Sequence, residues 1–356
     1  MKTYDIAVIA GDGIGPEVMA EAVKVLQTVA ELDGGLCFRF THYPWGCDYY
    51  LKTGQMMPEN GLELLSGHDA ILLGAVGTPG VPDHISLREL LLRIRHDFDE
   101  YINLRPVKLL RGASCPLKDV APENVDMVFI RENSEGEYSG QGAWLYPGTD
   151  REVVIQDGVF SRKGCERVIR YAYELARRES KSLTSVSKAN ALNYSMVFWD
   201  QIFAEIGREY PDVETRSLLV DAAAMFMVKE PQRFQIVVTS NLFGDILTDL
   251  GAAIAGGMGL AAGANLNPER RFPSMFEPIH GSAPDIAGQG AANPLAAIWS
   301  ASQLLDFLGH EDWGARVLAA IEALLERGAC LPPDQGGSAS TAECGDALCA
   351  LLRGDM

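Results

Sequence analysis

Short apolar runs alternate with longer amphipathic segments along this chain, and no other sequence feature constrains its fold as strongly. Residues 4–10 and 70–73 are apolar runs of strand length, whereas 16–32 and 163–179 have helical periodicity. Buried strands that alternate with helices are typical of α/β proteins. Because 356 residues exceed what a single hydrophobic core usually serves, we predict an α/β fold with two domains. The further strands predicted are 125–130, 236–239 and one that ends at 218–221, and the further helices are 86–98, 241–255, 294–308 and 313–326.

The chain is acidic, with 48 Asp and Glu side chains against 30 Lys and Arg and a formal net charge of −18. Such a surface repels nucleic acid and anionic lipid, and the sequence has no basic stripe of the kind that binds phosphate backbones. We therefore expect neither nucleic acid nor a membrane as a partner. A dianionic substrate would need a local cluster of arginines to overcome the negative potential of the chain. A cluster of that kind would therefore point to an anionic substrate.

The cysteines and the start of the chain bear on its cellular compartment. The seven cysteines are scattered and form no CxxC pair, so the sequence indicates neither a disulfide framework nor a thiolate zinc site. Residues 1–10 lack a cationic region followed by a long apolar stretch, so we expect no signal peptide. No apolar run approaches the roughly 20 residues of a membrane span. These features favour a cytoplasmic protein.

A glycine-rich turn, Gly-Asp-Gly-Ile-Gly-Pro at 11–16, joins the first predicted strand to the first helix. Its position suggests a dinucleotide-binding fingerprint, but the spacing does not match, because Pro16 stands where the third glycine of G-x-G-x-x-G should be. No acidic residue ends the next strand at the expected offset either. We interpret the motif as a tight turn and expect a fold other than the Rossmann fold.

Three aspartates are candidate metal ligands. Asp245 and Asp249 project from one face of the predicted helix 241–255, because residues four apart share a helix face. Such a pair more often belongs to a solvated face, but this helix is otherwise apolar and follows a buried strand, which favours a cleft. Asp221 ends a separate apolar strand and could supply a third carboxylate. Oxygen ligands of this kind suit Mg²⁺ or Mn²⁺.

Arg95, Arg105 and Arg131 are candidates for binding a dicarboxylic acid, because guanidinium groups hold carboxylates in bidentate pairs. The alternative is three unrelated surface ion pairs. Tyr138 follows Arg131 in the same polar segment, and Lys188 has no acidic residue beside it in the sequence. Spacing alone leaves Tyr138 and Lys188 open between a structural and a functional role.

Two segments have little helical signal. Residues 277–288 form a long Gly/Pro/Ser loop that leads to Asn293 and Pro294, where Asn293 can cap the next helix. A loop of that length within a compact domain is more often functional than a plain turn. Residues 140–160 hold alternating runs between Gly and Pro turns, which predicts a hairpin. A two-stranded hairpin is rarely stable alone, so this one is either a surface hairpin or a dimer-forming arm.

Taken in order, these motifs resemble the β-decarboxylating dehydrogenases, the family of isocitrate, 3-isopropylmalate, D-malate and tartrate dehydrogenases. The resemblance covers nearly the whole chain. The segments 43–46, 83–87 and 101–106 look closest to the tartrate and D-malate branch. The motifs that carry the resemblance are Gly-Asp-Gly-Ile-Gly-Pro-Glu at 11–17, Arg95 with Arg105, residues 131–138, Lys188-Ala-Asn, Asn-Leu-Phe-Gly-Asp-Ile-Leu-Thr-Asp at 241–249 and His-Gly-Ser-Ala-Pro-Asp at 280–285.

The resemblance implies three sets of binding residues. One set binds the substrate carboxylates, one binds Mn²⁺ or Mg²⁺, and one binds the nucleotide on the loop of the 280s. K⁺ is an additional candidate cofactor. The implied sets are Arg95, Arg105, Arg131 and Leu91 for the substrate; Asp221, Asp245 and Asp249 for the metal; and His280, Gly281, Ser282, Ala283, Asp285, Ile286 and Asn293 for the nucleotide.

The resemblance also implies catalytic roles and a homodimer. Lys188 would be the base for the 2-hydroxyl group, directly or through water, and Tyr138 the acid that protonates the enol after CO₂ leaves. Lys188 and Asp221 would reach across from the second subunit, so the active unit would be a dimer. Asp285 stands where NADP-using relatives carry a lysine, and its charge would repel a 2′-phosphate, so NAD is the expected nucleotide.

The implied fold is the two-domain isopropylmalate/isocitrate dehydrogenase fold with a discontinuous first domain. We expect residues 1–100 and 256–356 to form the nucleotide-binding domain and 101–255 the dimerisation and metal/substrate domain, with the arm around 140–160. The expected activity is oxidation of tartrate and D-malate, with or without decarboxylation. Since Leu91 and Leu92 match a leucine pair of isopropylmalate enzymes, 3-isopropylmalate is an alternative substrate. A metal-dependent decarboxylating lyase without net redox is an alternative of another class.

Overall fold

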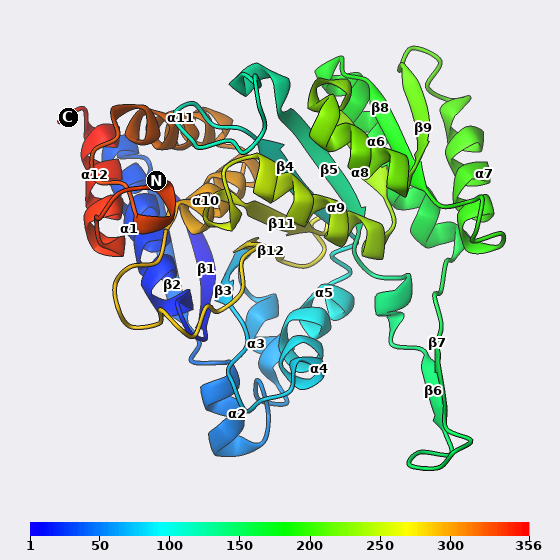
Figure 1. Cartoon of the computed structure of the whole chain (residues 1–356). Helices are drawn as coiled ribbons and strands as arrows, with labels where there is room; N and C mark the ends of the chain where they lie inside the picture. The colour runs from blue at the N-terminus through cyan, green and yellow to red at the C-terminus, as the bar shows by residue number, and fades with distance from the viewer. Residues whose placement is uncertain (356) are drawn as a thin grey trace. The chain divides into compact units, whose positions relative to one another are not determined.

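The computed structural model describes residues 1–355, which fold into two compact units (Figure 1). Unit 1 comprises Met1–Glu100, Leu109–Pro122 and the chain from Ala252 onward, whereas unit 2 comprises Tyr101–Lys108 and Glu123–Gly251. Strands and helices alternate in both units, so the predicted α/β class is confirmed. The limits differ from the expected domains at residues 109–122 and 252–255, which belong to unit 1. Among the described residues, no helix is both long and apolar enough to cross a membrane.

Unit 1 contains a mostly parallel sheet in the order β2-β1-β3-β12-β11. The first four of these strands run parallel, and β11 is antiparallel to β12. Ile6, Val8 and Leu72 are buried on β1 and β3, which explains why continuous apolar runs identified these strands in the sequence. The strands of unit 1 are β1 (Lys2–Gly11), β2 (Leu36–His42), β3 (Ala70–Ala75), β11 (Ala262–Leu266) and β12 (Ser274–Pro278).

The long helices of unit 1 pack on one another, with α1 beside α12 and α10 beside α11 (Figure 1). α10 also packs on β11 and β12 and is the central buried helix of this unit. α1 has Pro16 in its first turn and ends at Gly34, whose φ of 68° is the left-handed conformation that glycine adopts readily. The helices of unit 1 are α1 (Gly15–Asp33), α2 (Cys47–Thr53), α3 (Gly61–Ser66), α4 (Asp83–Ser86), α5 (Leu92–Asp97), α10 (Leu295–Phe307), α11 (Glu311–Arg327) and α12 (Thr341–Arg353).

The helix predicted at 86–98 is interrupted in the structure. A π-helical turn, Leu87–Leu91, separates α4 from α5. This wider turn leaves Leu91 half-buried against the apolar cluster that contains Leu90 and Ile94. Because a π turn adds a residue to one helical turn, the face presented by the following residues changes, and a count of helical periodicity cannot reveal this.

The sheet strands of unit 2 lie in the order β4-β5-β10-β8-β9 and are mostly parallel. Only β4 is antiparallel to its neighbour. α6 packs on β5 and β10, and α7 packs beside α6. The strands are β4 (Ile102–Lys108), β5 (Asp126–Glu132), β8 (Leu183–Ser187), β9 (Thr215–Leu219) and β10 (Ile236–Thr239), and the helices are α6 (Arg162–Glu179), α7 (Ser195–Gly207), α8 (Val220–Lys229) and α9 (Asn241–Ile254), the last of which ends in unit 1.

Two candidate site residues lie on different elements from those that the sequence suggested. Arg131 is part of β5, paired with Asn103 of β4, and does not lie in a loop beyond the strand. Asp221 is in the first turn of α8, because β9 ends at Leu219. The apolar run Leu218-Leu219-Val220 continues from β9 into α8 without a turn residue, so no local signal marks the change from strand to helix.

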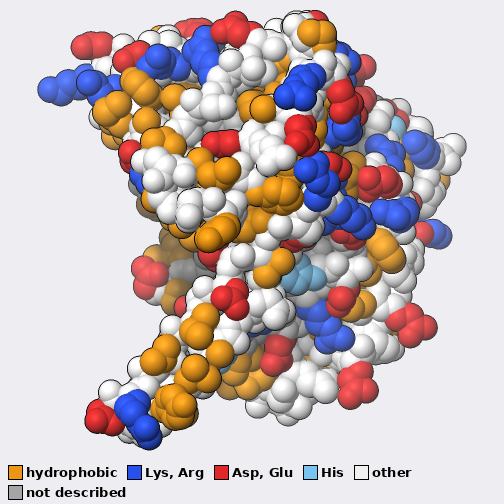
Figure 2. All heavy atoms as spheres, turned by 90° about the vertical axis from the view of Figure 1, so that its right-hand side faces the viewer, with side chains coloured by type: hydrophobic (Ala, Val, Ile, Leu, Met, Phe, Trp, Pro, Cys, Tyr) orange, Lys and Arg blue, Asp and Glu red, His pale blue; other side chains and the backbone are white. Residues whose placement is uncertain are grey.

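A two-stranded hairpin projects from unit 2 at the predicted place (Figure 1). β6 (Gly142–Leu145) pairs antiparallel with β7 (Val153–Gln156), and Trp144 stands opposite Val154. These two side chains are 67% and 64% exposed, and Figure 2 shows apolar groups along the hairpin. The hairpin therefore presents apolar surface on both strands.

Candidate active site

The carboxylate of Asp245, on α9, is the centre of a charged cluster in unit 2. Arg131 Nη1 lies 2.5 Å from Asp245 Oδ1, and Arg105 Nη1 lies 3.3 Å from the same oxygen. Tyr138 donates its hydroxyl hydrogen to Asp245 Oδ2 at 2.7 Å. The side chains of Arg131 and Arg105 are 1% and 6% exposed, whereas that of Asp245 is 35% exposed. Four residues that the sequence singled out separately thus meet at one carboxylate.

Polar neighbours fix the orientation of both guanidinium groups. Arg131 donates from Nη2 to Asn241 Oδ1 at 2.7 Å and from Nε to the Asn241 carbonyl at 2.9 Å. Arg105 donates from Nη1 to Thr248 Oγ1 at 2.7 Å and from Nε to Asn103 Oδ1 at 2.6 Å. Burying a cation is costly unless its N–H groups have acceptors, so these bonds are what allow the arginines to lie inside the unit.

Gly244 provides the space for Arg131. A Cβ atom built on Gly244 would lie 2.5 Å from Arg131 Cγ and 2.8 Å from Arg131 Cβ. These atoms are near the backbone of Arg131, so the whole side chain would have to shift. α9 therefore needs a residue without a side chain one position before Asp245.

Asp249 lies one helical turn after Asp245. Burial raises the pKa of Asp249, and the negative charge of Asp245 raises it further, while the positive charges of Arg105 and Arg131 lower it. Two carboxyl groups that repel each other at a partly buried place form a donor set that a divalent cation would stabilise. Hard oxygen donors suit Mg²⁺ or Mn²⁺. The chemistry of this pair fits the expected metal.

Lys188 and Asp221 lie together elsewhere in unit 2. Lys188 follows β8, and its Nζ donates to Asp221 Oδ1, which lowers the pKa of Asp221. The Asp221 side chain is 64% exposed. Within residues 1–355, no three His, Cys, Asp or Glu side chains form a group that could hold a metal ion. The single chain does not bring Asp221 to Asp245 and Asp249, and the expectation for Asp221 was in any case a site completed by a second subunit.

Arg95 is buried in unit 1. Its Nη2 donates to Glu277 Oε1 at 2.6 Å, and Asn265 Nδ2 donates to the same oxygen at 2.7 Å. Both partners of the ion pair are at least nine-tenths buried. The Arg95 Nε atom is also buried and has no hydrogen-bond partner among the described residues. Arg95 therefore has an N–H group available for an additional acceptor, and Leu91 lies one turn before it.

The loop of the 280s packs on the glycine turn of unit 1. The Ile14 amide donates to the Ser282 carbonyl at 2.8 Å. Gly13 has a φ of 57°, and a Cβ atom there would lie 2.0 Å from the Ser282 carbonyl oxygen. The glycine motif thus allows a close approach of two backbones, as expected for a tight turn. His280, at the start of this loop, has a buried Nε2 atom without a partner among the described residues, and burial lowers its pKa.

The rest of the loop is held by contacts at both ends. The Gly288 amide donates to Glu17 Oε1 at 2.5 Å, which ties the loop to α1. At the far end, Asn293 Oδ1 accepts the Leu295 amide at 2.9 Å, but the N-cap of α10 is Pro294, so the predicted cap is wrong by one residue. Asp285 is exposed, and Ala283 has a left-handed φ of 38°. The remaining expected nucleotide-binding positions, Gly281 and Ile286, lie on the same loop, Gly281 exposed and Ile286 half-buried.

The residues that support the site were not predicted from the sequence. Asn241 and Thr248 hold the arginines, Gly244 makes room for one of them, Glu277 pairs with Arg95, and Glu17 anchors the 280s loop. Four of the five lie inside motifs that had been singled out for other residues. A search for acceptors within one helical turn of Asp245 would have found Asn241 and Thr248, whereas the partner of Arg95 is remote in sequence.

Comparison with known proteins finds relatives in one family of dehydrogenases. The family model described as isocitrate/isopropylmalate dehydrogenase matches residues 5–348. A probable tartrate dehydrogenase/decarboxylase of Bacillus subtilis is 50% identical over 99% of both chains, and a decarboxylating D-malate dehydrogenase of Escherichia coli is 49% identical over 99% of both. A 3-isopropylmalate dehydrogenase of Thermobifida fusca is 52% identical over 97% of this chain and 96% of its own.

A solved structure supports the same assignment. The crystal structure of isocitrate dehydrogenase from Methylococcus capsulatus superposes with a TM-score of 0.88 at 35% identity, and it covers 98% of this chain and 99% of its own. The fold inferred from the resemblance is confirmed, and so is the resemblance itself. The chain belongs to the isocitrate/isopropylmalate dehydrogenase family and is an oxidoreductase.

Proposed function

We propose that the protein is an NAD- and divalent-metal-dependent dehydrogenase that oxidises tartrate and D-malate, with or without decarboxylation. The observation that carries this proposal is the cluster in which Arg105, Arg131 and Tyr138 converge on Asp245. It combines two buried cations that can bind carboxylates, a hydroxyl group that can donate a proton and a carboxylate that can bind a metal. The names of the relatives from Bacillus subtilis and Escherichia coli support the choice of acids.

The arginines can bind substrate by exchanging partners. The N–H groups that Arg105 and Arg131 direct to Asp245 Oδ1 have the geometry for a carboxylate acceptor. A substrate carboxylate would take these bonds, and Asp245 would be left with the hydrogen bond from Tyr138. Arg95 would contribute its Nε to a further carboxylate oxygen in the same role. This assigns Arg95, Arg105 and Arg131 to the acid, with Leu91 beside it.

Asp245 and Asp249 would hold the metal together with Asp221 of a second subunit. A divalent metal bound there supplies Lewis-acid polarisation of the substrate oxygens. Once the arginines bond the substrate, their charges would compensate less of the repulsion between Asp245 and Asp249, so the two carboxylates would favour a cation. K⁺ is an additional candidate, for which no residue is assigned.

Tyr138 and Lys188 are the proposed acid and base. Burial raises the pKa of Tyr138, and so does its hydrogen bond to Asp245, so the hydroxyl keeps its proton near neutral pH and can deliver it to a carbanion carbon. Lys188 Nζ is held by Asp221 and, once it has lost a proton to solvent, its neutral amine would take the proton of the substrate hydroxyl group, directly or through water. Because Lys188 and Asp221 lie together, one subunit would contribute both.

The 280s loop is the proposed nucleotide site. The partnerless Nε2 of His280 can bond a ring nitrogen or an amino group, and the neutral form that burial favours suits an uncharged base. The exposed carboxylate of Asp285 can accept ribose hydroxyl groups and would repel a 2′-phosphate. The positions proposed to line this site are His280, Gly281, Ser282, Ala283, Asp285, Ile286 and Asn293.

A homodimer is the proposed active unit. β6 and β7 expose Trp144, Val154 and Ile155, and a two-stranded hairpin of this kind gains stability only from a partner surface. Pairing of two such hairpins would bury the apolar stripe that Figure 2 shows. The same dimer would allow Lys188 and Asp221 to complete the site of the other subunit.

A substrate panel tests the function. With NAD and Mn²⁺, tartrate or D-malate should give NADH with a higher kcat/KM than 3-isopropylmalate, read by absorbance. NADH formation from 3-isopropylmalate alone would show that the alternative branch, supported by the Thermobifida fusca relative, is the right one. CO₂ release from tartrate without nicotinamide would instead favour the lyase.

Replacing Gly244 by Ala tests the carboxylate site. The added methyl group would displace Arg131, so kcat/KM for the acid should fall at least about tenfold while KM for NAD changes little. Ala253→Ser adds one atom at an exposed position of the same helix and should leave both parameters unchanged. An unaltered kcat/KM in the Gly244→Ala variant would contradict the role of Arg131.

Replacing Asp285 by Lys tests the nucleotide assignment. The lysine would attract a 2′-phosphate where the aspartate repels it, so the ratio of kcat/KM for NADP to that for NAD should rise at least about tenfold. Asp285→Asn removes the charge without adding one and should give a smaller rise. If neither variant changes the ratio, Asp285 does not face the ribose.

The double substitution Trp144→Ser with Val154→Ser tests the dimer. Sedimentation velocity should show a dimer for the unmodified protein and at least a tenfold weaker dimer for the variant, because both side chains are mostly exposed in the single chain. Asp150→Ser, in the turn between β6 and β7, is the matched control. A monomeric unmodified protein, or an unchanged dimer in the variant, would refute the proposal that the β6–β7 hairpin is a dimerisation arm.

A further inference from the structure

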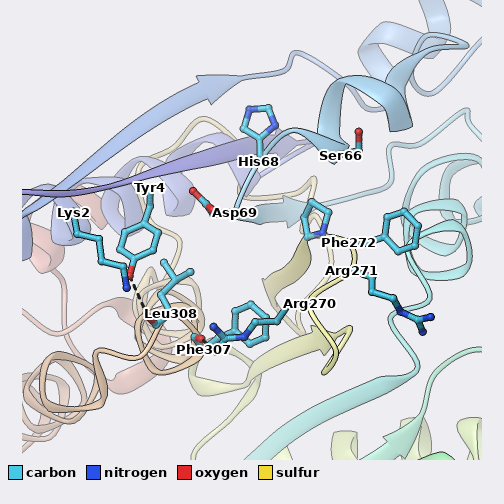
Figure 3. A pocket seen from close by; sticks show the side chains of 11 residues that line it. Lys2, Tyr4, Ser66, His68, Asp69, Arg270, Arg271, Phe272, Phe307 and Leu308 are labelled. Carbon is cyan, nitrogen blue, oxygen red and sulfur yellow. Dashed lines mark hydrogen bonds between the residues drawn. The ribbon is translucent and has the colours of Figure 1, made fainter.

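A pocket of about 240 Å³ lies in unit 1 at the amino-terminal ends of its parallel strands (Figure 3). β1 begins at Lys2, residues 66–69 lead into β3, and residues 270–273 lead into β12. The glycine turn and the 280s loop follow the opposite, carboxyl-terminal ends of these strands. β3 and β12 have six and five residues and therefore span roughly 15–20 Å, so the pocket is separate from the proposed nucleotide site.

The pocket carries positive charge that the protein does not neutralise. Lys2 Nζ lies 4.9 Å from the centre of the Tyr4 ring, and Arg270 lies over the Phe307 ring at 4.5 Å. No carboxylate among the described residues forms an ion pair with either cation. Asp69 also lines the pocket and contributes one negative charge, which Lys2 and Arg270 together exceed, and its Oδ2 accepts the Asp5 amide at 2.8 Å. In a chain with a net charge of −18, such a local excess of cations is unusual.

Both cations are linked to the carboxyl end of α10, Arg270 by a direct hydrogen bond and Lys2 through the ring of Tyr4. Tyr4, which contacts Lys2, donates its hydroxyl hydrogen to the Leu308 carbonyl at 3.1 Å, and Arg270 donates to the carbonyl of the preceding residue, Phe307. These carbonyls end α10, and the carboxyl end of a helix carries only about half a negative charge. The helix end therefore orients Lys2 and Arg270 without balancing their charge, and Figure 3 shows them beside Phe307 and Leu308.

We propose that this pocket binds a small multivalent oxyanion at a site separate from the catalytic residues. An anion between Lys2 and Arg270 would supply the missing countercharge. The volume is below the roughly 300–1,000 Å³ typical of larger ligands, so it admits a pyrophosphate or a tricarboxylate and excludes a dinucleotide. The shared chemistry is two or more negative charges on clustered oxygen atoms.

Titration calorimetry of the metal-depleted full-length protein tests the site, with inorganic pyrophosphate and citrate as separate probes. We expect saturable binding of at least one probe with a Kd below about 1 mM at low ionic strength. Pyrophosphate alone would identify a phosphate-bearing ligand, citrate alone a polycarboxylate, and both a general polyanion site.

The double variant Lys2→Gln with Arg270→Gln should weaken this binding at least fivefold. Lys2→Gln alone should weaken the binding to a lesser degree. Because the Lys2 side chain makes no hydrogen bond among the described residues, this variant separates weaker binding from a folding defect caused by loss of the bond between Arg270 and Phe307. Lys52→Gln, an exposed lysine on α2, is the matched control and should bind like the unmodified protein. The proposal is wrong if no probe binds, or if the double variant and the control bind equally.

Discussion

The buried guanidinium groups of unit 2 impose the constraint on which its site depends. Arg131 is 1% exposed and Arg105 6%, and such cations are tolerated only when an anion and neutral acceptors surround them. Asp245 supplies the anion, Asn241 and Thr248 supply the acceptors, and Gly244 supplies the space. All four lie on α9, so one helix determines where both arginines point.

A second constraint acts between backbones in unit 1. The turn at 11–15 approaches the 280s loop so closely that Gly13 has no room for a Cβ atom beside Ser282. Asp12 extends this arrangement, since its carboxylate accepts the amides of Cys47 and Gly77. The glycine motif that superficially indicates a dinucleotide fold thus serves the packing of two backbones. It supports the proposed nucleotide site through its contact with Ser282 of the 280s loop.

Apolar periodicity predicted most of the elements because buried strands and amphipathic helices leave a local signal. β1, β3, α1 and α9 lie within a residue or two of their expected limits. The errors concern residues at junctions. Asp221 was assigned to a strand end and lies on a helix, and Arg131 was assigned to a loop and lies in a strand. The partners of a polar residue depend on tertiary contacts, and these do not appear in the periodicity of the sequence. Arg95, for example, pairs with Glu277, which is 182 residues away.

Each cation assigned to catalysis or substrate binding has an internal carboxylate partner: Arg131 and Arg105 have Asp245, Arg95 has Glu277, and Lys188 has Asp221. Pairing reduces the cost of holding these charges in a partly buried place. It also means that an acid would displace Asp245 to bind Arg131 or Arg105, whereas Arg95 still has its Nε available. Displacement from Arg131 would leave the repulsion between Asp245 and Asp249 less compensated. A divalent cation would relieve that repulsion, so in the proposed site the acid and the metal would each make binding of the other more favourable.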